Sequence, residues 1–166
     1  MLMRRLTALA LVVAVILAVG CGGGSNSKSS SGNGGKQAEA AAAATGDIPD
    51  NQVFLTYRGP GYTVKYPEGW TKSGTGTDLH FTDKDNTIHL VLSGRPPPVP
   101  LNGGRAKVTL HKLGTPNSVT GKRPQLIIDR YVYGKGGKVV VLDLATPKGV
   151  DNVDAYRLIS QSFRWQ

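Results

Sequence analysis

The feature that most limits how this chain can fold is the tract at residues 22–46, which contains no Leu, Ile, Val or aromatic side chain. Gly, Ser, Asn, Lys, Gln and Ala make up nearly all of it, so it cannot bury enough apolar surface to offset the entropy cost of ordering. We therefore expect a flexible tether over residues 21–47. The core must then come from residues 48–166, which is room for one globular domain.

The segment before the tether, residues 1–20, has the pattern of a lipoprotein signal peptide. Arg4 and Arg5 form a basic head, and residues 6–19 are almost entirely apolar or small. An apolar run of this length fits the core of a signal peptide, whereas a membrane-spanning helix needs about 20 apolar residues. Residues 17–21, Leu-Ala-Val-Gly-Cys, resemble a bacterial lipobox that ends at Cys21.

The lipobox resemblance implies that Cys21 receives a diacylglycerol, that the chain is cut before it, and that palmitate or a similar acyl chain is added to the new amino group. We therefore expect a lipoprotein on the extracytoplasmic face of a bacterial cell membrane, held there by its lipid anchor. The alternatives are an ordinary secretory signal peptide and an uncleaved N-terminal anchor.

Cysteine content limits the kinds of fold, and charge limits the possible partners. Cys21 is the only cysteine, which excludes a disulfide framework within the chain and a Cys-based zinc finger. Residues 48–166 contain 16 Lys or Arg and 9 Asp or Glu, a net charge of +7. For an exported domain, the available anionic partners are lipid headgroups and cell-wall polymers rather than nucleic acid. The alternative is a mildly basic, solvated surface without such a partner.

Alternating apolar and polar residues, bounded by Gly, Pro and polar turns, predict strands in the domain. These strands are expected at residues 61–66, 78–82, 87–92, 107–113, 125–133 and 138–145. The polar turn at residues 83–86 predicts a hairpin in which Phe81 faces Ile88 and His80 lies opposite His89.

A second hairpin is expected around the turn Gly134-Lys135-Gly136-Gly137. With a four-residue loop, Arg130 would lie opposite Val141, and Asp143 would be its diagonal neighbour on the same face. We interpret Arg130 and Asp143 as a cross-strand ion pair rather than a catalytic group.

The end of the chain predicts a helix. Asp151 can accept hydrogen bonds from the first free amides, and Asp154 follows three residues later, as in a capping box. Prolines 96–98 predict an extended connector earlier in the domain. The apolar side chains that recur at helical spacing, and should dock on the sheet, are Val153, Tyr156, Ile159 and Phe163. Together, these strands and this helix predict an α+β fold, which is an antiparallel sheet built of hairpins with a C-terminal helix packed on one face.

Two motifs resemble the PsbP-like family. Residues 62–70, YTVKYPEGW, are similar to the family's opening strand and turn, and residues 152–164, NVDAYRLISQSFR, to its last helix and terminal Ser-Phe-Arg. The resemblance implies an α/β/α sandwich around an antiparallel sheet, and mostly non-catalytic roles in assembly or in binding partner proteins. Residues 96–98 and 103–104 are prolines and glycines where such proteins often carry a helix, so one helical layer could be reduced.

His80, His89 and Asp78 form the sharpest candidate site. Opposed side chains of an antiparallel pair have Cβ atoms about 4.5–5.5 Å apart. Two imidazoles at that spacing can share Zn²⁺ or Cu²⁺, with the Asp78 carboxylate on the same face as a third ligand. The alternative is a solvated face that carries two histidines.

No catalytic or cofactor-binding residue is predicted. The chain has no G-x-S-x-G motif, and Ser160 and Ser162 fall late in the expected helix without an adjacent histidine. We therefore expect a non-catalytic, lipid-anchored envelope protein that binds, or assists the assembly of, an exported or membrane protein. The alternative is a metal- or small-ligand-binding lipoprotein that serves a transporter, with weak transition-metal binding. A hydrolase acting on cell-wall material is a third hypothesis, for which the acidic residues show no pairing.

Overall fold

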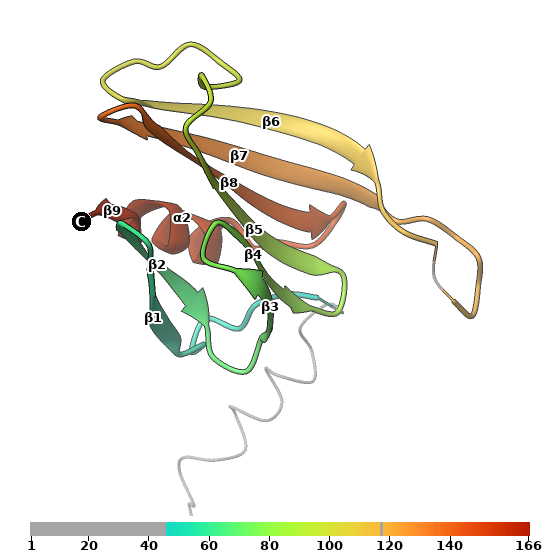
Figure 1. Ribbon diagram of the computed structural model, residues 1–166. Coiled ribbons are helices and arrows are strands. Elements are labelled where there is room, and N and C mark those ends of the chain that lie inside the picture. The colour runs from blue at the N-terminus through green and yellow to red at the C-terminus, as the bar shows by residue number, and fades with distance from the viewer. Residues whose placement is uncertain (1–45, 117) are drawn as a thin grey trace, which may run out of the picture. The chain divides into compact units, whose positions relative to one another are not determined.

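The computed structural model describes residues 46–116 and 118–166 (Figure 1). The predicted signal peptide, Cys21 and nearly all of the tether lie outside these residues. All of the described core belongs to the second of two units of the chain, Asn33–Gln166. Its elements are β1 (Phe54–Gly59), β2 (Tyr62–Pro67), β3 (Thr71–Thr75), β4 (Asp78–Asp83), β5 (Asn86–Ser93), β6 (Arg105–Leu113), β7 (Gln125–Lys135), β8 (Lys138–Pro147), α2 (Val153–Ser162) and β9 (Arg164–Trp165).

Two antiparallel sheets account for the strands. The larger has six strands in the order β3-β4-β5-β8-β7-β6, and the smaller has three in the order β1-β2-β9. The hairpins β4–β5 and β7–β8 join consecutive strands because short polar or glycine turns separate them. The predicted fold class, an antiparallel sheet of hairpins with a C-terminal helix, is confirmed.

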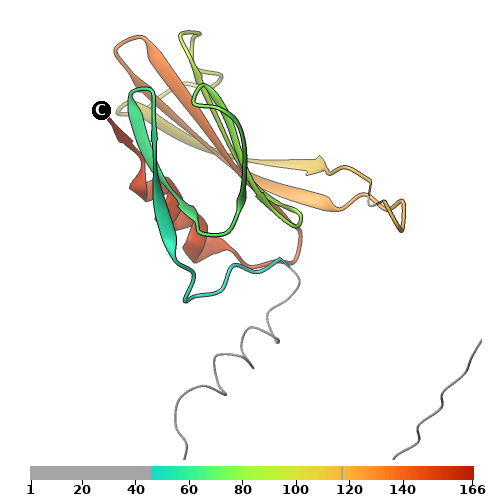
Figure 2. The ribbon, with the colours of Figure 1, turned by 60° about the horizontal axis from the view of Figure 1, so that its bottom comes forward.

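The core lies between one face of the large sheet and a layer made of α2 and the small sheet, which lie on the same side of it (Figure 2). Phe81, Ile88 and Leu142 point into it from the large sheet and are fully buried. Ile159 of α2 is fully buried as well, and the ring of Tyr66 from the small sheet stacks on Phe81 with centroids 4.2 Å apart. Every second residue of β4, β5 and β8 serves this core, so the residues between them face the other way.

A second helical layer is missing from the described residues, in which α2 is the only helix. Where such a helix would fall, prolines 96–98 are extended or bent, and Asn102 bridges to Arg105 around a glycine turn. Proline lacks the amide hydrogen that a helix needs, which explains the connector. None of the helical structure in the part of the chain described is long and apolar enough to span a bilayer.

The register of the β7–β8 hairpin corrects the sequence-based prediction. Lys135 pairs with Lys138, so the turn contains only Gly136 and Gly137, and Arg130 lies opposite Asp143 rather than Val141. Both glycines have positive φ, at 56° and 75°. A two-residue turn of this kind requires left-handed residues, and two glycines adopt that conformation without a steric penalty.

The helix begins two residues later than Asp151. The Asp151 carboxylate accepts a hydrogen bond from the Val153 amide, as expected, but Asn152 occupies the N-cap position with its side chain turned inward. The docking prediction for Val153 is wrong, because this side chain is 61% exposed. Tyr156, Ile159 and Phe163 are buried, as predicted; the helix turns Val153 outward because Asn152 takes the inward position beside it.

Asn152 is the centre of a buried hydrogen-bond network that fixes the start of the domain. Its side-chain oxygen accepts from the Ile48 amide at 2.7 Å, and its amide group donates to the Thr146 hydroxyl at 2.9 Å and to the Asn86 side chain at 3.1 Å. Asn86 in turn donates to the Gly46 carbonyl. The first described residues are thereby attached to the end of the sheet where β5 begins and β8 ends.

Candidate metal centre on the open face of the sheet

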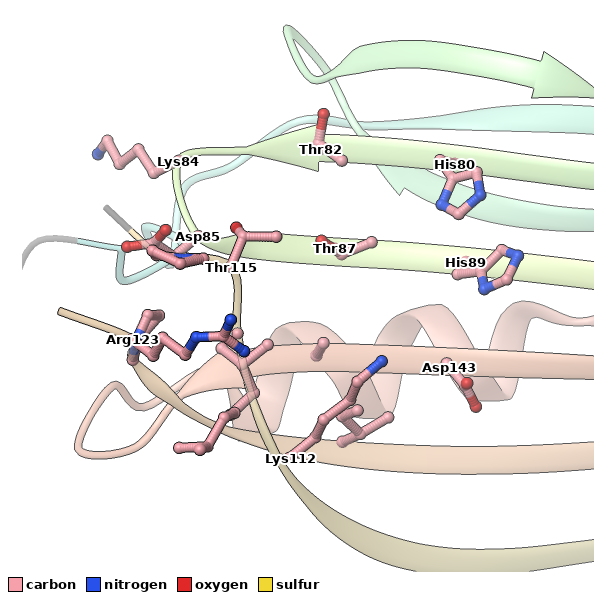
Figure 3. A pocket seen from close by; sticks show the side chains of 17 residues that line it. His80, Thr82, Lys84, Asp85, Thr87, His89, Lys112, Thr115, Arg123 and Asp143 are labelled. Atoms are coloured by element: carbon pink, nitrogen blue, oxygen red, sulfur yellow. The ribbon is translucent and has the colours of Figure 1, made fainter. Parts of the chain in front are cut away.

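The face of the large sheet that points away from α2 is called the open face here. Strand pairing places Arg130, Asp143, His89 and His80 in one row across β7, β8, β5 and β4 on this face. Asp78 lies two residues before His80, so its side chain is on the same face. Figure 3 shows His80 and His89 side by side on neighbouring strands, with Asp143 on the next strand.

The predicted opposition of His80 and His89 is confirmed. Their imidazole rings are nearly parallel, with an interplanar angle of 9° and centroids 3.9 Å apart. Both Nε2 atoms approach the same oxygen of Asp78, His89 at 2.9 Å and His80 at 3.4 Å. The three donor atoms lie within 4.8 Å of one another, so the hairpin alone gathers three metal-ligand side chains from 12 residues of chain.

Hydrogen bonding sets the electrostatics of this cluster. The hydrogen bond from His89, assisted by the charges of both histidines, lowers the pKa of the Asp78 carboxyl below its ordinary value and outweighs the opposing effect of desolvation. The carboxylate is therefore ionised at neutral pH, and it can accept a hydrogen bond from a protonated Nε2 or bind a cation. Its side chain is 65% exposed, so any bound ion would be in contact with water.

The separations of the donor atoms suit a tetrahedral ion, but the two stacked imidazole rings would have to rotate so that the ion lies in the plane of each ring. Ligand atoms about 2.0–2.1 Å from Zn²⁺ lie roughly 3.3–3.4 Å from each other, close to the 3.4 Å between His80 Nε2 and Asp78. The shorter contact from His89 is a hydrogen bond that an ion would replace, with the imidazole proton held on Nδ1 instead. Three protein ligands would leave a fourth position for water or for a group from another molecule.

Asp143 is not available as a further ligand, because Arg130 holds it. The guanidinium donates to both carboxylate oxygens at 2.7 Å, in a bidentate pair that raises the pKa of Arg130. The ion pair predicted from the sequence is confirmed, although the two residues are direct rather than diagonal neighbours. The Asp143 side chain is 14% exposed, so this pair fixes the middle of the open face.

A groove of about 710 Å³ extends along the open face from His80 and His89 to the loop between β6 and β7 (Figure 3). Leu126, Ile128 and Ala145 supply its apolar lining, and Lys112 and Arg123 lie at its far end. Sequence reasoning missed this groove because its lining comes from five strands and two loops, and no local pattern encodes the order of those strands in the sheet.

The class of protein defined by these observations is an antiparallel α+β domain with one sheet face that α2 and the small sheet leave uncovered, and with a histidine–aspartate cluster on that face. The chain is similar to a solved structure, the solution structure of the cyanobacterial PsbP protein CyanoP from Synechocystis sp. PCC 6803. The two are 17% identical, with a TM-score of 0.41, and the match covers 73% of this chain and 98% of that chain. No protein-family model matches the chain, and no curated protein matches it.

Proposed function

We propose that this protein is a non-catalytic, lipid-anchored module on the extracytoplasmic face of a bacterial membrane, and that it binds an exported or membrane protein. The pattern that ends at Cys21 and the tether after it support the anchoring, and the two PsbP-like motifs support the binding role. The structural observation that carries the proposal is the open face, because α2 and the small sheet cover only the opposite face. Its groove of about 710 Å³ offers both apolar and charged side chains to a partner.

Site-specific photo-crosslinking in intact cells tests the binding surface. A photoreactive residue at Thr82, on the open face and lining the groove, is expected to crosslink to one envelope protein. The matched control carries the same residue at Arg157, an exposed position of α2, and is expected to give no such product. Equal products from both positions, or none from Thr82 in cells where a known complex is recovered, would contradict the proposed surface.

A second candidate function is transition-metal binding, which the arrangement of Asp78, His80 and His89 favours. A lipid-anchored metal-binding protein could deliver an ion to a transporter or use the ion to bind its partner through the open fourth position. The exposure of all three ligands favours weak and reversible binding.

Zinc titration by calorimetry on Asn33–Gln166 separates this function from the first. His80→Ala removes one of three ligands and is expected to weaken binding roughly a hundredfold or more, since losing even an outer-shell partner costs 10- to 100-fold. His111→Ala is the matched control, because His111 is an exposed histidine of β6 outside the cluster. Identical heats for the unaltered domain and His80→Ala would rule out this site.

A further inference from the structure

The positive charge of the domain is concentrated in one hairpin. Residues 105–128 contain five Lys or Arg and no Asp or Glu, whereas the rest of residues 48–166 contains 11 and 9. This hairpin is formed by β6, the start of β7 and the loop between them. Five of the seven net positive charges therefore belong to 24 residues of chain.

The end of this hairpin combines cations with exposed apolar side chains. Its surface residues, called the hairpin tip here, are Lys112, Leu113, Val119, Lys122 and Arg123. Leu113 is 55% exposed and Val119 is 90% exposed. None of the three cations forms an ion pair within residues 46–116 and 118–166. The Gly114 amide donates to the Pro124 carbonyl and closes the base of the loop, which projects beyond the other strands in Figure 1.

The hairpin tip lies at the end of the sheet where the predicted tether joins the domain. Leu126 at the start of β7 pairs with Pro147 at the end of β8. The neighbouring Thr146 is bonded to Asn86, which holds the Gly46 carbonyl. Gly46 and the base of the β6–β7 loop are therefore at the same end of the large sheet. A flexible chain of about 25 residues has an r.m.s. span of roughly 25–30 Å, so an anchor at Cys21 would keep this end close to the bilayer.

We propose that the hairpin tip docks the domain onto an anionic phospholipid surface. Lys112, Lys122 and Arg123 would contact lipid phosphates, and Leu113 and Val119 would enter the boundary between headgroups and acyl chains. A soluble cell-wall polyanion could attract the same cations but offers no apolar layer for the two aliphatic side chains. The orientation argument rests on the proposed lipid anchor, whereas the binding itself belongs to residues of the described domain.

Vesicle co-sedimentation of unlipidated Asn33–Gln166 tests this inference without the anchor. The probes are vesicles of phosphatidylcholine alone and vesicles that also contain phosphatidylglycerol. We expect binding only to the anionic vesicles, and weaker binding as salt is added. Each cation near such a surface contributes roughly a fivefold gain in affinity, so the triple variant Lys112→Gln, Lys122→Gln, Arg123→Gln should bind roughly a hundredfold more weakly.

The matched control removes three other exposed cations, Arg58→Gln, Lys135→Gln and Lys138→Gln. Lys135 and Lys138 flank the turn of the β7–β8 hairpin, at the end opposite the hairpin tip. Arg58 lies in β1, and Gly61, just after that strand, is close to the Lys138 ammonium. This variant has the same net charge as the tip variant and should retain most of the binding. Equal losses in both variants would show an effect of net charge alone and would overturn the assignment to the hairpin tip.

A third variant, Leu113→Ser with Val119→Ser, distinguishes a lipid surface from a soluble polyanion as the ligand of the hairpin tip. It keeps every charge, and we expect roughly tenfold weaker vesicle binding because apolar burial is lost. Unchanged vesicle binding would contradict insertion and favour a polyanion as the natural ligand. If the domain fails to bind anionic vesicles at low salt, this inference is wrong, while the dependence of membrane attachment on Cys21 still tests the anchor separately.

Discussion

Asn152→Ala is expected to lower the free energy of unfolding of the domain by about 3 kcal/mol. The substitution removes the acceptor of the Ile48 amide and the donor to Thr146 and Asn86, in a region where all these groups are shielded from water. Each buried polar group left without a partner costs about 1–3 kcal/mol. The costs do not add fully, because neighbouring groups can shift toward one another.

Urea unfolding and thermal melting of Asn33–Gln166 measure this effect. A loss of about 3 kcal/mol in a domain of this size should lower Tm by roughly 10 °C. Asn51→Ala is the matched control, since Asn51 lies exposed in a turn, and its effect should stay within about 0.5 kcal/mol. A loss for Asn152→Ala no larger than that of the control would show that the network does not hold the start of the domain.

The β4–β5 hairpin could be predicted from the sequence because its information is local. A polar four-residue turn separates two segments of alternating apolar and polar residues, so the pairing of Phe81 with Ile88 also fixes His80 opposite His89. The candidate metal centre depends on this one hairpin, which is why sequence reasoning could name all three of its residues. The Arg130–Asp143 pair was recognised from charge, but its register depends on a turn that glycines allow to be shorter.

The sequence analysis did not predict the strands β1, β3 and β9. For β3 and β9 the reason is physical. All five residues of β3 are exposed, so nothing in Thr71–Thr75 shows the apolar alternation that indicates a buried face. β9 has only two residues and forms by pairing with β2, about 100 positions earlier in the chain. The role of Asn152 was missed for the same reason as β9. Its partner Ile48 is 104 residues away, and no local sequence pattern indicates a buried asparagine.

The concentration of cations in residues 105–128 was present in the sequence but was obscured by their spacing. Arg105, Lys107, Lys112 and the Lys122–Arg123 pair do not form a run. The strand pairing shows that they belong to one hairpin, and that Lys107 is engaged by Asp129 at 2.8 Å, whereas Lys112, Lys122 and Arg123 have no ion pair among the described residues. Topology therefore distinguishes cations that stabilise the fold from cations that are free to meet a ligand.

Cys21→Ser is expected to abolish membrane attachment. Only a thiol can accept the diacylglycerol, and each buried CH₂ of an acyl chain contributes about 0.8 kcal/mol, so two or more chains hold a protein stably while none leaves only surface contacts. We also expect the serine variant to escape processing that is sensitive to globomycin. The variant leaves the described domain unchanged, because Cys21 lies outside it.

Detergent-phase partitioning of the full chain from cells, beside the Cys21→Ser variant, tests the central claim of a lipid-anchored extracytoplasmic module most directly. The unaltered protein should enter the detergent phase, and mass spectrometry should find its processed N-terminus at a lipid-modified Cys21. The serine variant should remain in the aqueous phase at the mass of an unmodified chain. Partitioning of the variant into detergent to the same extent as the unaltered protein would contradict the account.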